Sequence, residues 1–397
     1  MITLSDRINS MEESATIGMA KKSRELKAQG KDIISLSLGE PDFFTPQFIK
    51  DAAVEALNNN FTMYTPVSGY DDLRESISLK FKRDNGLDYT KDQIVVSTGA
   101  KQSIANVVLS IINPGDEVII PAPYWVSYLE IVKVAEGKSV VVNAGIESDF
   151  KITPEQLEKA ITPKTRMMIF STPCNPTGTV YSKNELHELA QVIRKYPQLV
   201  VISDEIYEHI NFIGKHESLA QFSEVYNQVV TINGVSKAWA MTGWRLGYIG
   251  APKEIAVACD KMQGQFTSAT SSITQKATIA AMHAKTTVLK DMIEAFHRRR
   301  DLVLSKLNEI SGVKTNVPGG AFYVFPDVST FFGKSYNQYT IKDSNDLCMY
   351  LLDEGLVAFV SGEAFGAPEC LRISYAASEE TLTEAMRRMK IALNKLL

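Results

Sequence analysis

Short apolar runs alternate with longer amphipathic stretches between about residues 50 and 285 of this chain of 397 residues. Apolar runs of about four to eight residues are typical of strands that are buried on both faces of a parallel sheet. The alternation therefore predicts an α/β fold with a mostly parallel, mixed central sheet sandwiched by helices. The predicted strands are residues 93–97, 117–120, 166–170, 199–203, 229–233 and 246–249, and the predicted helices are residues 50–58, 71–85, 100–112 and 183–196.

The pattern changes after about residue 285. A long charged helical stretch at residues 290–310 leads into the sequence GGAFY at residues 319–323, and separate αβ units follow. This change predicts a second, smaller domain, which the N-terminal segment joins. We therefore expect a large domain at residues 47–285 and a small domain made of residues 1–46 and 286–397.

The composition is that of an ordinary globular protein, with 45% hydrophobic and 22% charged residues. A net charge of −4 gives no electrostatic reason to expect nucleic acid or an anionic membrane as a partner. No apolar run approaches the length of a membrane span, and the acidic N-terminus lacks an apolar signal core, so we expect a cytoplasmic protein. The four cysteines are far apart and form no CxxC pair, which argues against a disulfide framework and a metal site.

Unusual residues follow the ends of five predicted strands. In open α/β sheets the ligand crevice lies outside the carboxyl ends of the strands, so these residues are expected to gather in one site. They are Gly99-Ala100-Lys101, Trp125, Asn175, Asp204 and Ser236-Lys237.

Lys237 lies in the segment SKAWAMTGWR, with Ser236 before it and Arg245 soon after it. A lysine withdrawn from water loses part of its preference for the charged form and can act as a nucleophile or Schiff-base partner. A neighbouring hydroxyl and an arginine suit an anionic group such as a phosphate. The alternative is a solvated surface lysine. The combination predicts a site for pyridoxal 5′-phosphate.

Other strand-end residues have roles in such a site. Asp204 would face the pyridine nitrogen and keep it protonated, although it could instead cap a following helix. Asn175 and Tyr207 could donate hydrogen bonds to the ring's phenolate oxygen, although Asn-Pro-Thr-Gly is also a good turn sequence. Trp125 offers a face for stacking on the ring or a side chain for the core.

A phosphate would find donors at the turn Gly99-Ala100-Lys101, where a predicted helix begins with unpaired backbone N–H groups. The Ser236 hydroxyl and the Arg245 guanidinium would complete this cup. The motifs GxxxxGK[ST] and GxGxxG after a strand are both missing, which disfavours a nucleotide cofactor.

Sequence blocks along nearly the whole chain carry a family likeness. They are SLGEPDFFTP, YTPVSGYDDLR, STGAKQ, PAPYWVSY, STPCNPTGTVYS, SDEIYE, SKAWAMTGWRLGY, PGGAFYVFP and LRISYA. Through their order and spacing the chain resembles fold-type I pyridoxal phosphate enzymes, and among them class I aminotransferases of the bacterial aspartate aminotransferase type. The resemblance implies Lys237 as the Schiff-base lysine and Asp204 as the partner of the ring nitrogen. The further cofactor residues that it implies are Gly99, Ala100, Lys101, Trp125, Asn175, Tyr207, Ser236 and Arg245.

The resemblance also implies the substrate contacts. Arg372 matches the arginine that clamps the α-carboxylate, and Gly39 matches a backbone contact to the same group; Trp125 and Asn175 are expected to touch the substrate as well. Lys101 matches the lysine that meets a distal carboxylate, and a cation beside a helix N-terminus is better explained by an anionic ligand nearby. Tyr64 matches a residue that reaches the phosphate of a neighbouring subunit, which implies a homodimer with shared active sites.

The resulting hypothesis is an aminotransferase with a ping-pong mechanism. Its expected substrates are an L-amino acid and a 2-oxo acid, with L-aspartate and 2-oxoglutarate favoured. Activity on prephenate or another amino acid is an alternative, because prephenate carries a similarly placed second carboxylate. A carbon–sulfur lyase on the same scaffold and a non-catalytic module with the same fold are competing hypotheses.

Overall fold

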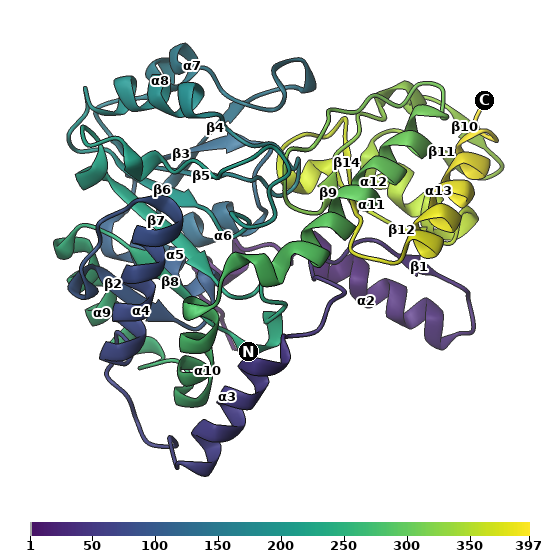
Figure 1. The fold of residues 1–397 in the computed structure, drawn as a ribbon. Coiled ribbons are helices and arrows are strands. Elements are labelled where there is room, and N and C mark those ends of the chain that lie inside the picture. The colour runs from purple at the N-terminus through teal and green to yellow at the C-terminus, as the bar shows by residue number, and fades with distance from the viewer. Residues whose placement is uncertain (1) are drawn as a thin grey trace.

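The computed structural model describes residues 2–397, and its larger part is built around a seven-stranded sheet (Figure 1). The strand order across the sheet is β2-β8-β7-β6-β5-β3-β4. The strands are β2 Ile94–Ser97, β3 Glu117–Ala122, β4 Lys138–Asn143, β5 Thr165–Ser171, β6 Val200–Asp204, β7 Val229–Gly234 and β8 Gly247–Gly250.

The sheet is mixed because of one strand. β3 to β7 pair in parallel, whereas β8 runs antiparallel to both of its neighbours, β2 and β7. The predicted fold class, a mostly parallel mixed sheet between helices, is therefore confirmed. The reversal matters for the site, because the amino end of β8 lies at the edge where the other strands end.

Each predicted strand corresponds to an observed one within two residues, but β4 was missed. β4 forms an edge of the sheet and is only partly buried along its length, with exposed Lys138 and Asn143 at its ends. A partly exposed edge strand lacks the continuous apolar run by which the buried strands were recognised.

The predicted helices are also present, with one change of geometry. They are α3 Gln47–Asn58, α4 Asp71–Lys80, α5 Ala100–Ile111 and α8 Lys183–Ile193. The prediction of one helix over residues 71–85 was wrong in its second part, since Phe81–Asn85 forms a π-helix, η1. Gly86 ends it in the left-handed conformation, with φ of 72°, which favours glycine.

Helices cover both faces of the sheet, and neighbouring residues of a strand point into different cores. Ile119 packs in the cluster that contains Leu186 of α8, whereas Val118 and Ile120 pack in the cluster that contains Val107 of α5. α5 packs against α9 Lys253–Phe266, and α10 Ser272–His283 packs against α3 and α4.

The smaller part of the molecule is joined through α11 Lys290–Asn308 (Figure 1). It holds a three-stranded antiparallel sheet of order β13-β14-β9, with β9 Tyr323–Val324, β13 Val360–Ser361 and β14 Leu371–Ser374. α12 Ser344–Glu354 and α13 Glu379–Leu393 pack there too.

The N-terminal segment lies on this smaller part. β1 Ile34–Ser35 pairs in parallel with β12 Val357–Ala358, and α2 Ala15–Ala28 contacts β12 and β13. Across residues 2–397, no helix has the length and apolar character needed to cross a membrane.

Candidate active site

A cavity of about 280 Å³ lies at the carboxyl edge of the seven-stranded sheet and is closed by residues of the smaller part. It brings together all the site residues predicted from the sequence except Gly99 and Tyr64. The predicted residues that line it are Gly39, Ala100, Lys101, Trp125, Asn175, Asp204, Tyr207, Ser236, Lys237, Arg245 and Arg372.

Strand direction explains this gathering. Asp204 is the last residue of β6, and Lys237 follows the end of β7. Arg245 stands two residues before the first residue of β8, and it reaches the same edge because β8 runs in the opposite direction. Arg372 comes from β14 of the smaller part.

The amine of Lys237 is held away from bulk water. Its Nζ donates a hydrogen bond to the carbonyl oxygen of Gly39 at 2.6 Å. Burial lowers the pKa of Lys237 to about 8, and the positive charge of Arg372 acts in the same direction. A much larger fraction of this amine is therefore neutral at physiological pH than for an ordinary lysine, as a nucleophile requires.

The carboxylate of Asp204 has a hydrogen bond on each oxygen. The hydroxyl of Tyr128 donates to Oδ2 at 2.7 Å, and the backbone N–H of Ile206 donates to Oδ1 at 3.3 Å. Burial raises the pKa of Asp204 to about 6, while the Tyr128 hydrogen bond opposes this shift. Asp204 thus caps the turn that follows β6 and also faces the cavity, so the two roles considered for it are compatible.

Arg372 is a buried cation with an unused donor. Only 1% of the residue is exposed; Nη1 donates to Asn175 Oδ1 at 2.9 Å and Nη2 donates to the carbonyl of Ser37 at 2.6 Å. Its Nε is buried and has no hydrogen-bond partner among the described residues. A buried donor left unpaired costs free energy, and an anionic ligand would satisfy it.

A second anion site lies where α5 begins. Gly99 is the N-cap residue of α5 and offers no side-chain cap, so the first N–H groups of the helix are open to a ligand. The φ of Gly99 is 87°, and a Cβ there would lie 3.0 Å from Cζ of Arg245. Gly99 therefore lies beside the cavity wall rather than in it, and it allows the Arg245 guanidinium to approach the helix N-terminus. The donor set fits a phosphate.

Lys101 lies on the first turn of the same helix. Its Nζ is 4.9 Å from the centre of the Trp125 ring. Burial lowers the pKa of Lys101, and the charge of Arg245 contributes in the same direction. Two cations at one helix N-terminus repel each other and the helix dipole, which an anionic ligand would offset.

Tyr64 is a predicted site residue that is almost fully exposed to solvent. It is 99% exposed and does not line the cavity. Its predicted role belongs to a neighbouring subunit and stays a prediction.

Two buried tyrosines that line the cavity were not assigned from the sequence. Tyr128 stands three positions after Trp125, a spacing that places both on one side of a helix start, and this was an available signal. Tyr323 lies within the GGAFY sequence, but nothing in the sequence indicates which residues it contacts.

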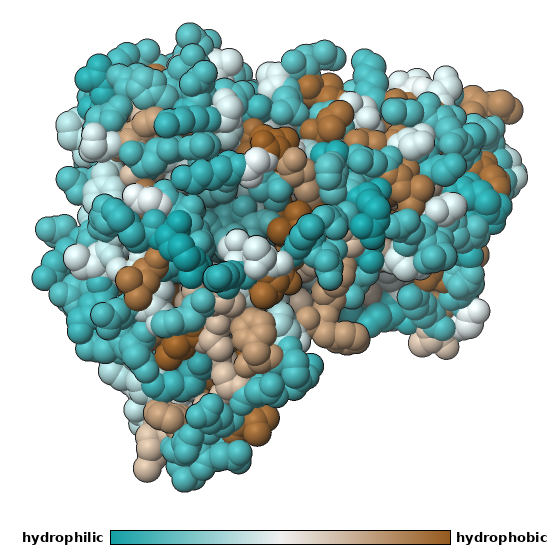
Figure 2. All heavy atoms as spheres, viewed as in Figure 1, coloured by the Kyte–Doolittle hydropathy of each residue, from teal (hydrophilic) through white to brown (hydrophobic). Residues whose placement is uncertain are grey.

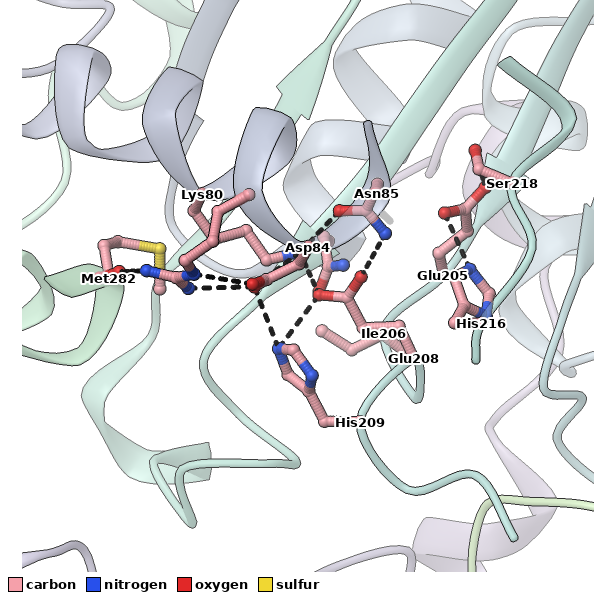
Figure 3. A network of polar contacts seen from close by, with 12 residues as sticks. Lys80, Asp84, Asn85, Glu205, Ile206, Glu208, His209, His216, Ser218 and Met282 are labelled. Carbon is pink, nitrogen blue, oxygen red and sulfur yellow. Dashed lines mark hydrogen bonds and ion pairs between the residues drawn. The ribbon is translucent and has the colours of Figure 1, made fainter. Parts of the chain in front are cut away.

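The turn that follows Asp204 is anchored by a network of buried charges (Figure 3). Lys80 forms an ion pair with Glu208, and it also donates to Asn85 Oδ1 at 2.9 Å. Asn85 in turn donates to Glu208 Oε2 at 2.7 Å. Lys80 and Asn85 are five positions apart, and the i→i+5 geometry of the π-helix turns both toward Glu208.

A second anchor lies on the other side of the turn (Figure 3). The buried carboxylate of Glu205 accepts hydrogen bonds from the hydroxyls of Ser203 at 2.8 Å and Ser218 at 2.7 Å. It also lies 2.9 Å from Nε2 of His216. Burial alone would lower the pKa of His216, but the charge and hydrogen bond of Glu205 outweigh it, so the pKa is raised. The residues between Asp204 and Tyr207 are therefore held from both ends.

Known proteins share both the sequence and the fold. Residues 31–389 match the family model described as aminotransferase class I and II. The chain is 47% identical over 397 residues, 99% of its length and 83% of the relative's, to a bifunctional aspartate aminotransferase and glutamate/aspartate-prephenate aminotransferase of Petunia hybrida. It is also 47% identical to an aspartate/prephenate aminotransferase of Nitrosomonas europaea, over 97% of this chain and 98% of the relative.

Solved structures agree with these sequence matches. The aspartate aminotransferase of Rhizobium meliloti superimposes with a TM-score of 0.97 at 42% identity, and both chains are covered completely. The aspartate aminotransferase of Thermus thermophilus, solved with maleate, superimposes with a TM-score of 0.93 at 40% identity, covering 99% of this chain and 100% of that one.

Replacing Lys80 by methionine is expected to lower the free energy of unfolding by about 3–5 kcal/mol, because Glu208 would remain buried without the lysine charge and with the His209 ring, 3.1 Å away, as its nearest basic group. Denaturant unfolding measures this loss. The matched control is Lys195→Met, which removes an ion pair with Glu158 whose side chains are 50% and 44% exposed. The control should change stability by less than about 1 kcal/mol. Equal effects of the two substitutions would contradict a special role for the buried pair.

The acylation rate of Lys237 in the cofactor-free protein is expected to rise with pH through a midpoint near 8, because only the neutral amine reacts. An ordinary lysine titrates near 10.4. A small acylating reagent followed by peptide mass spectrometry measures the midpoint at this position. In Arg372→Met the midpoint should move upward, since the charge of Arg372 lowers the pKa of Lys237. A midpoint above 10 in the unaltered protein would refute this description of the amine.

Proposed function

The chain belongs to the class I and II aminotransferase family, and we propose that it transfers an amino group between L-aspartate and 2-oxoglutarate with pyridoxal 5′-phosphate as its cofactor. One observation carries the proposal. A lysine of lowered pKa, a buried carboxylate and two separate cations for carboxylates, Arg372 and Lys101, line one cavity. The cavity is lined by residues of two parts of the chain, which we propose to be a large domain at residues 47–285 and a small domain of residues 1–46 and 286–397.

The lining residues fit the cofactor. When bound, pyridoxal phosphate supplies an aldehyde that takes up the amino group and a ring that accepts electrons. Asp204 would hold the ring nitrogen, and Asn175 and Tyr207 would donate to the ring oxygen. The indole of Trp125 would cover one face of the ring.

The phosphate would lie at the N-terminus of α5. Its ligands there would be the backbone N–H of Ala100, the hydroxyl of Ser236 and the guanidinium of Arg245, with Gly99 leaving room for the arginine. These groups anchor the cofactor and leave the amine of Lys237 free to act.

Lys237 has two tasks in this scheme. Its neutral amine would bind the cofactor aldehyde. After the substrate amine displaces it, the same nitrogen would take a proton from the substrate α-carbon and return it at C4′ of the cofactor, the carbon on the other side of the substrate nitrogen. A lowered pKa suits this task, because a larger share of the free amine is neutral and able to accept a proton near neutral pH.

The two cations select the substrate. Arg372, which is buried and has a free Nε, would hold the α-carboxylate that every amino acid carries. Lys101 would meet a second carboxylate, so a dicarboxylic acid satisfies both. The names of two relatives include prephenate. These names are compatible with an additional amino acceptor for this protein that carries a second carboxylate in a similar place.

A homodimer with shared active sites and a cytoplasmic location are parts of this proposal. Exposed apolar side chains gather near residues 44–64, where Phe44 is 93%, Met63 is 80% and Tyr64 is 99% exposed. Figure 2 shows apolar atoms over the region of α3 and α10. We propose that a second copy covers this face and that Tyr64 reaches the phosphate of the partner.

The proposed reaction is tested by its first half. Protein loaded with pyridoxal phosphate should show a visible absorbance band, and borohydride treatment followed by peptide mapping should place the label on Lys237. Addition of L-aspartate alone should replace this band by the absorbance of the amine form of the cofactor, and 2-oxoglutarate should restore the band. A lyase would not need the second keto acid, so turnover of aspartate without one would overturn the transferase assignment, and a label elsewhere would overturn the site.

Lys101→Ala is expected to reduce the rate of the half-reaction with L-aspartate by roughly tenfold to a hundredfold, the value of one charged hydrogen bond. The reaction with L-alanine, which has no second carboxylate, should change by less than about threefold. Stopped-flow absorbance gives both rates at subsaturating amino acid. An equal loss for both amino acids would assign Lys101 to the cofactor or to the fold.

A further inference from the structure

Tyr323 joins the two parts of the molecule inside the cavity. It belongs to β9 of the smaller part, it is fully buried, and its hydroxyl lies 2.8 Å from the hydroxyl of Tyr207, which comes from the turn after β6. The two rings meet edge to face, with centroids 5.9 Å apart. This hydroxyl pair is a polar contact between the two parts of the molecule, made by two residues that line the cavity.

The position of the Tyr323 hydroxyl is tightly defined. A Cβ on Gly39 would lie 3.4 Å from Cζ of Tyr323 and closer still to its oxygen, so only glycine leaves the hydroxyl its place. The guanidinium of Arg372 lies over the Tyr323 ring at 4.7 Å. Tyr323 is thus confined between Gly39, Arg372 and Tyr207.

The direction of the hydrogen bond between the two tyrosines follows from counting protons. A phenol has one proton to donate and can accept through its oxygen. If Tyr207 gives its proton to the ring oxygen of the cofactor, it can only accept at the 2.8 Å contact, and Tyr323 must be the donor. Among the described residues, Tyr207 is the hydrogen-bond partner of the Tyr323 hydroxyl, so no competing protein acceptor diverts that proton.

The cation over the ring strengthens this donor. A positive charge beside a phenol favours negative charge on its oxygen and so makes the O–H a better donor. Burial raises the pKa of Tyr323, and Arg372 opposes that rise. Hydrogen bonds in a chain also polarise one another, so a donor behind Tyr207 strengthens the bond that Tyr207 gives.

We propose that Tyr323 is a positioning residue, which donates its proton to Tyr207 and thereby directs the Tyr207 proton to the ring oxygen of the cofactor. The proposal rests on the proposed function, since it concerns the same site. It assigns a role in the chemistry to a residue of the smaller part that need not touch the cofactor.

Tyr323→Phe keeps the ring and removes the donor. Tyr207 then gives a weaker bond to the ring oxygen, more negative charge stays on the cofactor, and the Lys237 nitrogen joined to it becomes more basic. The pH midpoint of the visible band should rise by roughly 0.3 to 0.5 unit, as a weakening of one charge-assisted hydrogen bond by about 20–30% implies. Replacing Tyr323 by 3-fluorotyrosine, a more acidic phenol, should lower the midpoint.

A double-mutant cycle tests whether Tyr323 acts through Tyr207. Tyr207→Phe alone should raise the midpoint, and adding Tyr323→Phe in that background should add less than about 0.2 unit, because the bond that it supports is already gone. The charged groups that face Lys237, namely Arg372, Glu40, Asp204 and Arg245, are unchanged in all of these variants.

Tyr375→Phe is the matched control. Tyr375 is also fully buried in the smaller part, and its hydroxyl donates to the carbonyl of Ala321 at 3.2 Å, outside the cavity lining. The Tyr375→Phe variant should leave the pH midpoint of the visible band unchanged. Its free energy of unfolding, measured with denaturant, should fall by about as much as that of Tyr323→Phe.

The possible outcomes separate this inference from the proposed function. A visible band labelled at Lys237 with midpoints that do not move in Tyr323→Phe overturns the inference alone. Equal shifts with and without the Tyr207 hydroxyl, or an equal shift in Tyr375→Phe, also overturn it. If no visible band appears, or if the borohydride label is not on Lys237, the proposed function is overturned, and this inference is overturned with it.

Discussion

Burial of charge at one edge of a sheet is the constraint on which the site depends. Lys237, Asp204 and Arg372 are all withdrawn from water, and each is shifted toward its neutral form by that burial. Such groups cost free energy unless partners hold them, and the same low dielectric strengthens every contact that they make with a ligand. The site is therefore held by protein hydrogen bonds but keeps unused capacity, such as Nε of Arg372, for an anion.

The surroundings of Asp204 show how the fold meets this constraint. Behind the turn that follows it, Lys80, Arg83 and the His216 imidazole stand against the carboxylates of Asp84, Glu205 and Glu208. Their contacts reach from α4 and the π-helix on one side to Ser218 on the other. Because paired buried charges tolerate little displacement, this network keeps Asp204 and Tyr207 at a fixed spacing.

Strand-end residues could be predicted from the sequence because buried parallel strands give an unmistakable apolar pattern and share one ligand edge. Arg372 and Gly39 came only from the family resemblance, since strand position alone makes neither unusual. Three features escaped for physical reasons. β4 lies at the sheet edge and lacks a continuous apolar run, and the π-helix at residues 81–85 keeps an ordinary helical composition. The contact of Tyr323 with Tyr207 joins positions 116 apart in the chain, which no local pattern encodes.

The two proposed carboxylate sites differ in how firmly the protein holds their cations. Arg372 is fixed by Asn175, Ser37 and the Tyr323 ring, so its fork has one orientation, which suits the proposed contact with the carboxylate that all amino acids share. Lys101 lies at the rim on a flexible stem and acts as a point charge beside Trp125. A rigid clamp for the constant group and an adjustable charge for the variable one would let a single cavity accept acids that differ in the position of their second carboxylate. Relatives at 43% to 47% identity carry names with aspartate alone, with aspartate and prephenate together, or with both activities in one chain, a range that such a division would accommodate.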